Sequence, residues 1–317
     1  MSDKPSVVLV HGFWGGAAHW ADVIVELNKR GYTDLHAVEN PLTSLADDAE
    51  RTRKMVAQID GPVILVGHSY GGAVITEMGD QPNVLGLVYI AAFAPDAGES
   101  PGGITQEMPP EAAPNLEPDS DGYLWVKQDK FHESFCQDLG DEQALVMAVT
   151  QKAPLGSTFE DAVTDPAWKA KPTWYQVSTQ DRMIAPDNER RMAERMQPQK
   201  TIELDASHAS LASQPKAVAD LIDGVTLQLS QAKPGETFRL DVASDPASLR
   251  GVVDEFVKAY NAAITQLRTQ TAPGTESSSA GALRGDSAAR GIMQALRTAV
   301  GTHYAAASAL GLKTATD

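Results

Sequence analysis

The sequence is poor in cysteine and in basic residues, and it has no long apolar run. Cys136 is the only cysteine among 317 residues, which excludes an internal disulfide and suits a reducing cytoplasm. No apolar run approaches the ~20 residues that cross a bilayer. Residues 1–5 also lack the basic and apolar regions of a signal peptide. We therefore expect a cytoplasmic protein that does not interact with membranes.

The shortage of basic residues is confined to one part of the chain. The 26 Lys and Arg residues stand against 42 Asp and Glu residues, a net charge of −16, so nucleic acid is not an expected partner. Residues 224–317 contain nine basic and eight acidic residues, whereas all five tryptophans precede residue 224. The composition predicts two modules, 1–223 and 224–317.

The first module alternates short apolar runs with amphipathic segments. We expect strands at residues 6–10, 35–39, 63–66, 84–91, 173–178 and 201–204, and helices at 18–30, 45–59, 69–79, 187–196 and 215–222. Strands that are apolar throughout imply a mostly parallel sheet covered on both faces. The alternation breaks over 95–168, where helices expected at 125–139 and 141–151 predict an inserted helical cap.

The second module has a different pattern, typical of a small α+β unit. Apolar and polar residues alternate on both sides of Lys233-Pro234-Gly235, which predicts a β-hairpin over 225–242. Asp245-Pro246 then starts a long helix whose apolar stripe continues to Leu267. A linker at 271–281 precedes a second amphipathic helix at 292–300. The module therefore consists of a hairpin and two long helices.

A serine between glycines lies where an expected strand turns into an expected helix. Residues 65–74 read LVGHSYGGAV, which matches the pattern G-x-S-x-G at Ser69. In a nucleophile elbow the serine occupies a strained turn, and Gly67 and Gly71 would remove the side chains that clash there. The alternative is a serine in a purely structural turn. The strand before it and the helix after it favour the nucleophile.

A serine nucleophile needs a base, and the base needs an orienting acid. His208 follows the last expected strand, from which it could reach back to Ser69. Asp181 follows the preceding strand, and the order Ser, Asp, His is that of a nucleophile-elbow enzyme. Asp205 and Asp187 are the alternative acids. We expect Ser69, His208 and Asp181 to form a catalytic triad.

A second glycine-rich loop would complete such a site. Residues 11–16 read HGFWGG and follow the first strand. The backbone N–H of Phe13 could face that of Tyr70 across the oxyanion of a tetrahedral intermediate. His11 and His68 are expected to support these loops.

The remaining aromatic and histidine residues suggest a pocket but no metal centre. An apolar pocket is expected from five aromatic residues, of which the last three could equally be ordinary core: Phe13, Trp14, Trp125, Phe131 and Phe135. No metal-ligand spacing links the other histidines, which are His19, His36, His132 and His303. We expect no metal and no cofactor.

These motifs make residues 4–223 resemble the α/β-hydrolase superfamily. The resemblance lies in HGFWGG, GHSYGG, STQDRMIAP and DASHASL, and it is strongest to small cofactor-free esterases, including plant methyl esterases and pyrethroid-type carboxylesterases. It implies an α/β-hydrolase fold and hydrolysis of a small-molecule ester through an acyl-enzyme. The related hydroxynitrile lyases carry a lysine beside the catalytic histidine, whereas Ala209 follows His208 here. A lyase or a cofactor-free haloperoxidase is the alternative on the same fold.

Residues 220–317 resemble an unrelated family. The segments FVKAYN and GALRGD are similar to the C-terminal region of flagellar hook-associated protein 2, the filament cap. That resemblance implies possible self-association through 224–317. It also leaves open a flagellum-associated or extracellular location, and a structural role with a vestigial hydrolase domain.

Overall fold

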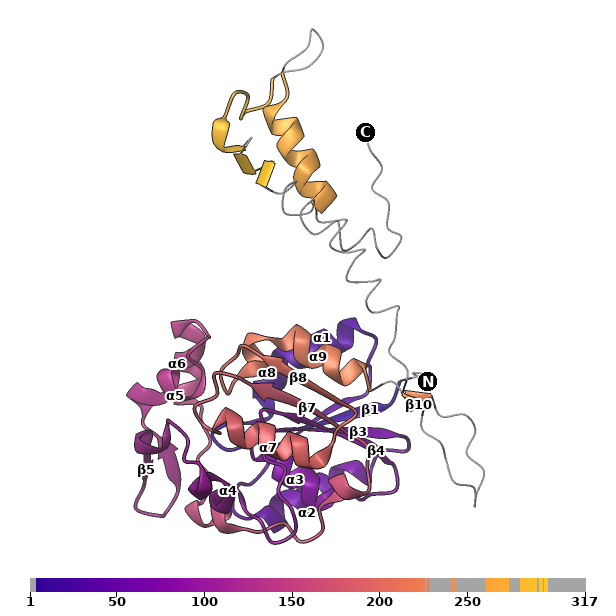
Figure 1. Cartoon of the computed structure of the whole chain (residues 1–317), viewed down its shortest axis with the longest axis vertical. Coiled ribbons are helices and arrows are strands. Elements are labelled where there is room, and N and C mark those ends of the chain that lie inside the picture. The colour runs from indigo at the N-terminus through magenta and orange to yellow at the C-terminus, as the bar shows by residue number, and fades with distance from the viewer. Residues whose placement is uncertain are drawn as a thin grey trace. The chain divides into compact units, whose positions relative to one another are not determined.

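The chain divides into two compact units, residues 1–244 and 245–317 (Figure 1). The computed structural model describes residues 4–225, 260–273, 280–289, 291–292 and 294–295, and the backbone of 227–228 and 241–242. The division lies after the 223/224 boundary suggested by composition, since the strand pair β9 (Leu227–Gln228) and β10 (Asp241–Val242) belongs to the first unit. A domain boundary at 223/224 stays a prediction.

The first unit is built on a six-stranded sheet whose strands are all parallel. Their order is β2-β1-β3-β4-β7-β8. The strands are β1 (Ser6–Val10), β2 (Leu35–Val38), β3 (Val63–His68), β4 (Val84–Ile90), β7 (Thr173–Ser178) and β8 (Lys200–Leu204). The chain reverses its direction of winding between β1 and β3, and ligands bind beyond the carboxyl ends of the strands at such a point. Ser69 directly follows β3.

Helices cover both faces of this sheet (Figure 1). On one face lie α1 (Ala21–Lys29), α8 (Ser210–Ser213) and α9 (Pro215–Asp223), and on the other α2 (Leu45–Val56), α3 (Gly71–Met78) and α7 (Pro186–Met196). Alternate residues of β1 enter two separate cores, because successive strand side chains point to opposite faces. Val7 and Leu9 join the core beneath α1 and α9, whereas Val8 and Val10 join the core beneath α2 and α3. The predicted α/β-hydrolase fold class is confirmed.

The expected cap lies between β4 and β7, but it is not wholly helical. It contains α4 (Pro101–Glu107), β5 (Leu116–Pro118), β6 (Leu124–Val126), α5 (Phe131–Phe135) and α6 (Asp141–Val149). The helix expected at 125–139 is confined to α5, because residues 124–126 pair with 116–118 as an antiparallel hairpin and residues 136–140 are not helical. Such pairing outweighs local propensity. Short 3-10 turns occur at Ala17–Trp20, Ala113–Asn115, Gln128–Lys130, Gly156–Glu160 and Ala167–Lys169.

The second unit is described only in part. Residues 260–271 are helical, as are 287–289, 291–292 and 294–295. The first segment overlaps the first expected helix and extends past Leu267, and the others lie within or just before the second expected helix. Residues 245–259 and 296–300 lie outside the described residues. The β9–β10 pairing agrees with the expected hairpin.

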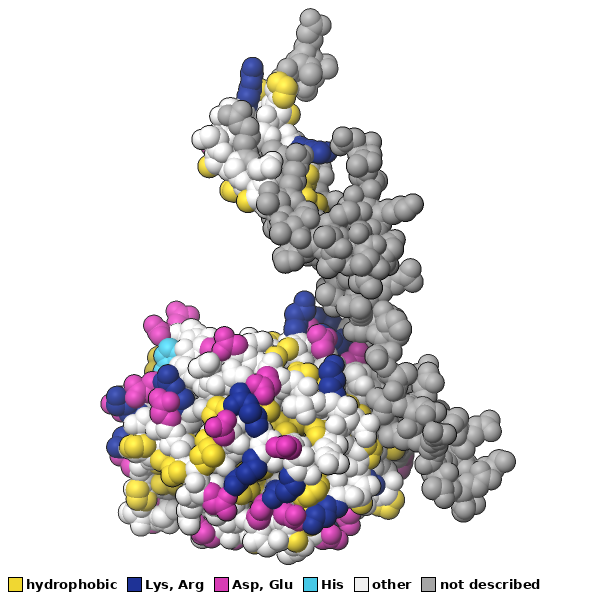
Figure 2. Space-filling model, in the orientation of Figure 1, with side chains coloured by type: hydrophobic (Ala, Val, Ile, Leu, Met, Phe, Trp, Pro, Cys, Tyr) yellow, Lys and Arg dark blue, Asp and Glu magenta, His cyan; other side chains and the backbone are white. Residues whose placement is uncertain are grey.

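The surface of the first unit mixes charges of both signs. Figure 2 shows acidic and basic side chains interspersed over the visible face of this unit. Several of them pair, as Arg190 does with Glu203 at 2.9 Å and Arg195 with Glu99 at 2.7 Å. Among the residues described, no helix is both long enough and apolar enough to cross a membrane.

Candidate active site

Ser69 occupies a strained turn between β3 and α3. Its φ is +56°, in the left-handed region that residues with a side chain rarely adopt. The chain can turn this sharply because glycines stand two residues before and two residues after Ser69. A Cβ on Gly67 would lie 2.5 Å from the Gly71 carbonyl oxygen, and a Cβ on Gly71 would lie 2.3 Å from that of Val10. The Ser69 carbonyl accepts hydrogen bonds from the N–H groups of Gly72 and Phe93, which hold the turn closed.

Asp181 and His208 lie together on the loops that follow β7 and β8. The Asp181 Oδ2 atom is 2.5 Å from Nδ1 of His208, and both side chains are fully buried. The other oxygen, Oδ1, accepts the N–H groups of Met183 at 2.7 Å and Ile184 at 2.9 Å. These two donors fix the carboxylate, which in turn fixes the orientation of the imidazole.

The alternative acids lie elsewhere. Asp187 pairs with Arg190 on the surface of α7 at 2.9 Å, and Asp205 is exposed. Of the three aspartates considered from the sequence, Asp181 is the one that contacts His208.

The His208 imidazole is enclosed but keeps one nitrogen free. The Nε2–H of His68 donates to the His208 carbonyl oxygen at 2.7 Å, and the two rings lie 4.7 Å apart. Burial lowers the pKa of His68 well below its usual value, so His68 is a neutral donor. The Phe135 ring also packs edge-on against the His208 ring, with centroids 4.9 Å apart. Within the described part of the chain, Nε2 of His208 is buried and has no hydrogen-bond partner.

The HGFWGG loop lies directly against the elbow. A Cβ on Gly12 would lie 2.5 Å from the Cβ of Ser69 and 2.9 Å from its Oγ, so only glycine fits there. Among the residues that the structure describes, the backbone N–H groups of Phe13 and Tyr70 donate no hydrogen bond. The Phe13 and Tyr70 rings stack with centroids 4.0 Å apart. These two unpaired N–H groups are suited to bind an oxyanion.

His11 anchors the same loop through both ring nitrogens. Its Nε2 accepts the N–H of Asn40 at 3.0 Å, so the proton must lie on Nδ1, which donates to the Gly12 carbonyl at 2.8 Å. Burial lowers the pKa of His11, in keeping with this neutral tautomer. His11 therefore supports the loop, as expected from the sequence.

The Tyr70 side chain is held by a buried carboxylate. Its hydroxyl donates to Oδ2 of Asp48 at 2.7 Å, and Oδ1 of Asp48 accepts the N–H of Leu42 at 2.9 Å. Burial raises the pKa of Asp48 to about 6, an effect that the two donors partly offset. Nothing in the sequence pattern marked Asp48, which lies on the polar-looking first turn of α2.

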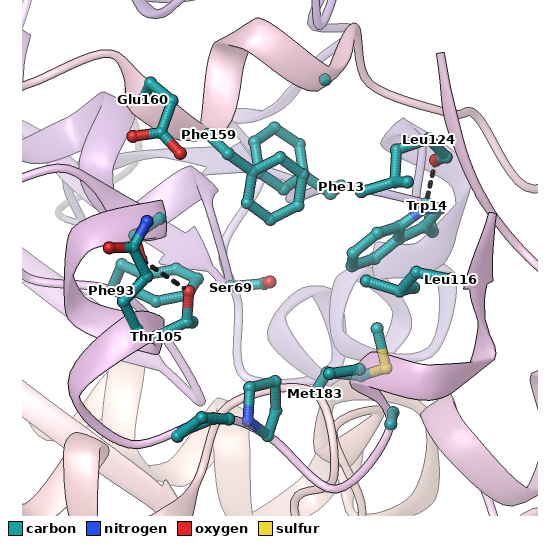
Figure 3. A pocket seen from close by; sticks show the side chains of 17 residues that line it. Phe13, Trp14, Ser69, Phe93, Thr105, Leu116, Leu124, Phe159, Glu160 and Met183 are labelled. Carbon is teal, nitrogen blue, oxygen red and sulfur yellow. Dashed lines mark hydrogen bonds between the residues drawn. The ribbon is translucent and has the colours of Figure 1, made fainter. Parts of the chain in front are cut away.

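An apolar cavity of about 410 Å³ opens above Ser69. Figure 3 shows the Ser69 hydroxyl pointing into a space ringed by Phe13, Phe159, Trp14 and Met183. The Trp14 indole N–H donates to the carbonyl oxygen of Leu124 at 2.7 Å, which orients the ring. Cap residues thus form much of the wall opposite the serine.

The expected pocket residues divide into two groups. Phe13 and Trp14 line the cavity, whereas Trp125, Phe131 and Phe135 do not. Trp125 is 37% exposed and its indole N–H donates to Asp119 in the cap, while Phe131 and Phe135 are fully buried and stack on each other at 5.0 Å. Lining residues that the sequence did not reveal include Phe93, Thr105, Leu116, Leu124, Phe159, Glu160 and Met183. Phe93 and Met183 follow strands β4 and β7, and this position just after a strand was the sequence signal that could have identified them.

The buried histidines do not form a metal centre. In the described residues, no group of three or more His, Cys, Asp or Glu side chains is placed to hold a metal ion. Burial lowers the pKa of His19 to about 4, so this histidine is neutral.

Comparison with known proteins identifies the first unit. A model of the alpha/beta hydrolase family matches residues 7–221. The chain belongs to the alpha/beta hydrolase family. This hydrolase is 24% identical to "Probable hydrolase R7" of Phoma sp. over 69% of the chain and 97% of that protein. It is 27% identical to "Methylesterase 8" of Arabidopsis thaliana over 68% of the chain and 88% of that protein.

Other relatives and solved structures agree with this placement. The hydrolase is 34% identical to the "Carbendazim hydrolyzing esterase" of Nocardioides sp. over 33% of the chain and 50% of that protein. Its fold matches that of a pyrethroid hydrolase from Sphingobium faniae, with a TM-score of 0.59 and 21% identity over 69% and 96% of the two chains. It also matches polyneuridine aldehyde esterase, with a TM-score of 0.61 and 18% identity over 70% and 99%.

A second family model matches the other end of the hydrolase. The C-terminus of flagellar hook-associated protein 2 matches residues 201–317 and overlaps the first match at 201–221. The resemblance noted from FVKAYN and GALRGD is thereby confirmed.

Proposed function

We propose that this hydrolase cleaves carboxylic esters through an acyl-enzyme formed on Ser69. The observation that carries the proposal is the buried Asp181–His208 pair. Nε2 of His208 has no hydrogen-bond partner in the part of the chain described. Such a nitrogen is what a general base for a serine hydroxyl requires. The strained backbone of Ser69 and the relatives named as esterases support the same reaction.

The chemistry proceeds in two halves. Nε2 of His208 takes the proton of Ser69 Oγ as Oγ bonds to the ester carbonyl carbon, and Asp181 stabilises the imidazolium without taking the proton. The oxyanion accepts hydrogen bonds from the N–H groups of Phe13 and Tyr70. The imidazolium then protonates the departing alcohol oxygen. Water then attacks the acyl carbon while Nε2 of His208 takes a proton from it. This step releases the carboxylic acid and regenerates Ser69.

The cavity favours an ester with an apolar body. Its wall carries aromatic side chains, and its volume of about 410 Å³ lies within the range of small-molecule sites. No cofactor takes part in this mechanism. A screen of p-nitrophenyl esters of increasing acyl length would show where the cavity stops accepting substrate.

The proposal is tested by replacing the nucleophile. We expect Ser69→Ala to lower kcat for p-nitrophenyl acetate by about 10⁴-fold or more, since the triad acts as a unit. The matched control is Ser120→Ala, which removes an exposed hydroxyl in the cap. Circular dichroism of both variants checks the fold. Full activity in Ser69→Ala would show that the triad assignment is wrong.

A second role is supported by the match at residues 201–317 to the flagellar protein. We propose that the region from 224 onward associates with copies of itself. This role is separate from the hydrolytic site and leaves the triad unaffected. Lyase or haloperoxidase chemistry on the same triad stays an alternative to hydrolysis. Release of the alcohol and the free acid in the ester assay identifies hydrolysis.

A further inference from the structure

A second acidic side chain lies behind the Asp181–His208 pair. Glu189, on α7, is fully buried, and one of its oxygens, Oε2, accepts the N–H of Ser178 at 3.0 Å. The other oxygen, Oε1, is buried without a hydrogen-bond donor among the described residues. The N–H of Asp181 donates to the carbonyl oxygen of the same Ser178 at 3.2 Å, so the two acids flank one residue, and the Asp181 carboxyl raises the pKa of Glu189 both as a neighbouring charge and as a hydrogen-bond partner. Two ionised carboxylates cannot share such a contact, so one of them must carry a proton.

The surroundings decide which carboxyl holds the proton. Asp181 accepts three N–H donors, from His208, Met183 and Ile184, whereas Glu189 accepts one. More donors stabilise the charged form, so the proton of the pair belongs on Glu189, which has fewer donors. Burial and the neighbouring Asp181 both raise the pKa of Glu189 well above its usual value.

No nearby group supplies a counter-charge to Glu189. The Arg190 guanidinium, next along α7, lowers the pKa of Glu189 only weakly, because it is directed to Asp187 and Glu203. The hydroxyl of Tyr175, on β7, donates instead to the carbonyl oxygen of Ala92. The charged and titratable groups around Glu189 are therefore Asp181, with its partner His208, Tyr175 and Arg190.

We propose that Glu189 is a neutral carboxylic acid that donates a hydrogen bond to Asp181 and acts as a positioning residue for the Asp181–His208 pair. The role rests on the proposed function, in which His208 is the base. The donated hydrogen bond holds the carboxylate in line with Nδ1 of His208. Ionisation of Glu189 would place two like charges in contact and displace Asp181.

Three variants separate this role from simple packing. Glu189→Gln keeps a donor toward Asp181 and an acceptor for Ser178, so we expect kcat within about threefold of the parent. Glu189→Leu fills the space without a donor, so we expect kcat to fall about tenfold or more with KM unchanged, as for an interaction made in the transition state. Glu194→Gln removes an exposed charge from the same helix and is the matched control.

Infrared spectroscopy tests the proton itself and does not depend on catalysis. At about pH 8, where Asp48 with its pKa of about 6 is ionised, the parent should show the carbonyl stretch of a buried carboxylic acid that Glu189→Gln lacks. Absence of this band from the parent would overturn the proposal, as would equal activity of Glu189→Leu and Glu189→Gln. If the parent cleaves no ester, the proposed function fails, whereas the band still decides the state of Glu189.

Discussion

Replacing Tyr70 with phenylalanine tests the link between the Tyr70 side chain and the buried Asp48 carboxylate. The change removes the hydroxyl that donates to Asp48 at 2.7 Å and keeps the ring that stacks on Phe13. A buried hydrogen bond to a charged group contributes about 1.5–3 kcal/mol, and one between neutral groups about 0.5–1.5 kcal/mol. We therefore expect the loss of stability to depend on whether Asp48 is ionised.

The sign of the pH dependence follows from the pKa of Asp48. In the parent this pKa is raised to about 6, mainly by burial, and loss of the tyrosine donor raises it further. Between the two values the folded variant holds a proton that the folded parent has released. The variant therefore loses stability relative to the parent as the pH rises through about 6. At about pH 5 both proteins hold the proton and the difference is small.

Urea unfolding followed by tryptophan fluorescence measures this difference. All five tryptophans precede residue 224, so the signal reports the first unit. We expect Tyr70→Phe to lower the free energy of unfolding by about 1.5–3 kcal/mol at about pH 8 and by about 0.5–1.5 kcal/mol at about pH 5. The control is Tyr89→Phe, whose hydroxyl contacts Thr76 at 2.9 Å and no carboxylate. Equal losses for Tyr70→Phe at the two pH values would refute the reasoning.

Two further predictions concern substrate charge and self-association. Among the described residues that line the cavity, Glu160 is the one with a charged side chain. Glu160→Gln should therefore raise kcat/KM for an ester with a free carboxylate by about fivefold, the equivalent of about 1 kcal/mol, and leave that for a neutral ester unchanged. No change for the anionic ester would contradict this. Light scattering should give the full chain a mass above that of its monomer and a 1–244 truncation the mass of a monomer, whereas monomeric masses for both would exclude self-association.

The sequence was most informative where local pattern and backbone chemistry agree. The strands at 6–10 and 173–178 have the predicted bounds, because each is a short buried run between clear turn signals. Asp181 and His208 were predicted to meet, since both follow neighbouring parallel strands, whose carboxyl ends meet at one edge of the sheet. The spacing of Gly67 and Gly71 around Ser69 likewise has a backbone cause.

Residues whose role depends on tertiary contacts could not be found in this way. The sequence left Trp125 and Phe135 between the pocket and ordinary core. The cap hairpin turns Trp125 outward, and Phe135 packs against His208. Asp48 and Glu189 lie in helix segments that appear solvent-exposed by composition. Each is buried because it lies next to a residue of another element: Tyr70 for Asp48, and Asp181 for Glu189. Sequence periodicity contains no information about such pairs.

The central claim is that Ser69 is a nucleophile activated by His208, and covalent labelling tests it most directly. A fluorophosphonate reacts with an activated serine and leaves a phosphonyl group that peptide mass spectrometry can locate. We expect one label, on the peptide containing Ser69, with none in Ser69→Ala and strongly slowed labelling in His208→Ala. An unlabelled parent, or a label on another serine that persists in Ser69→Ala, would contradict the account.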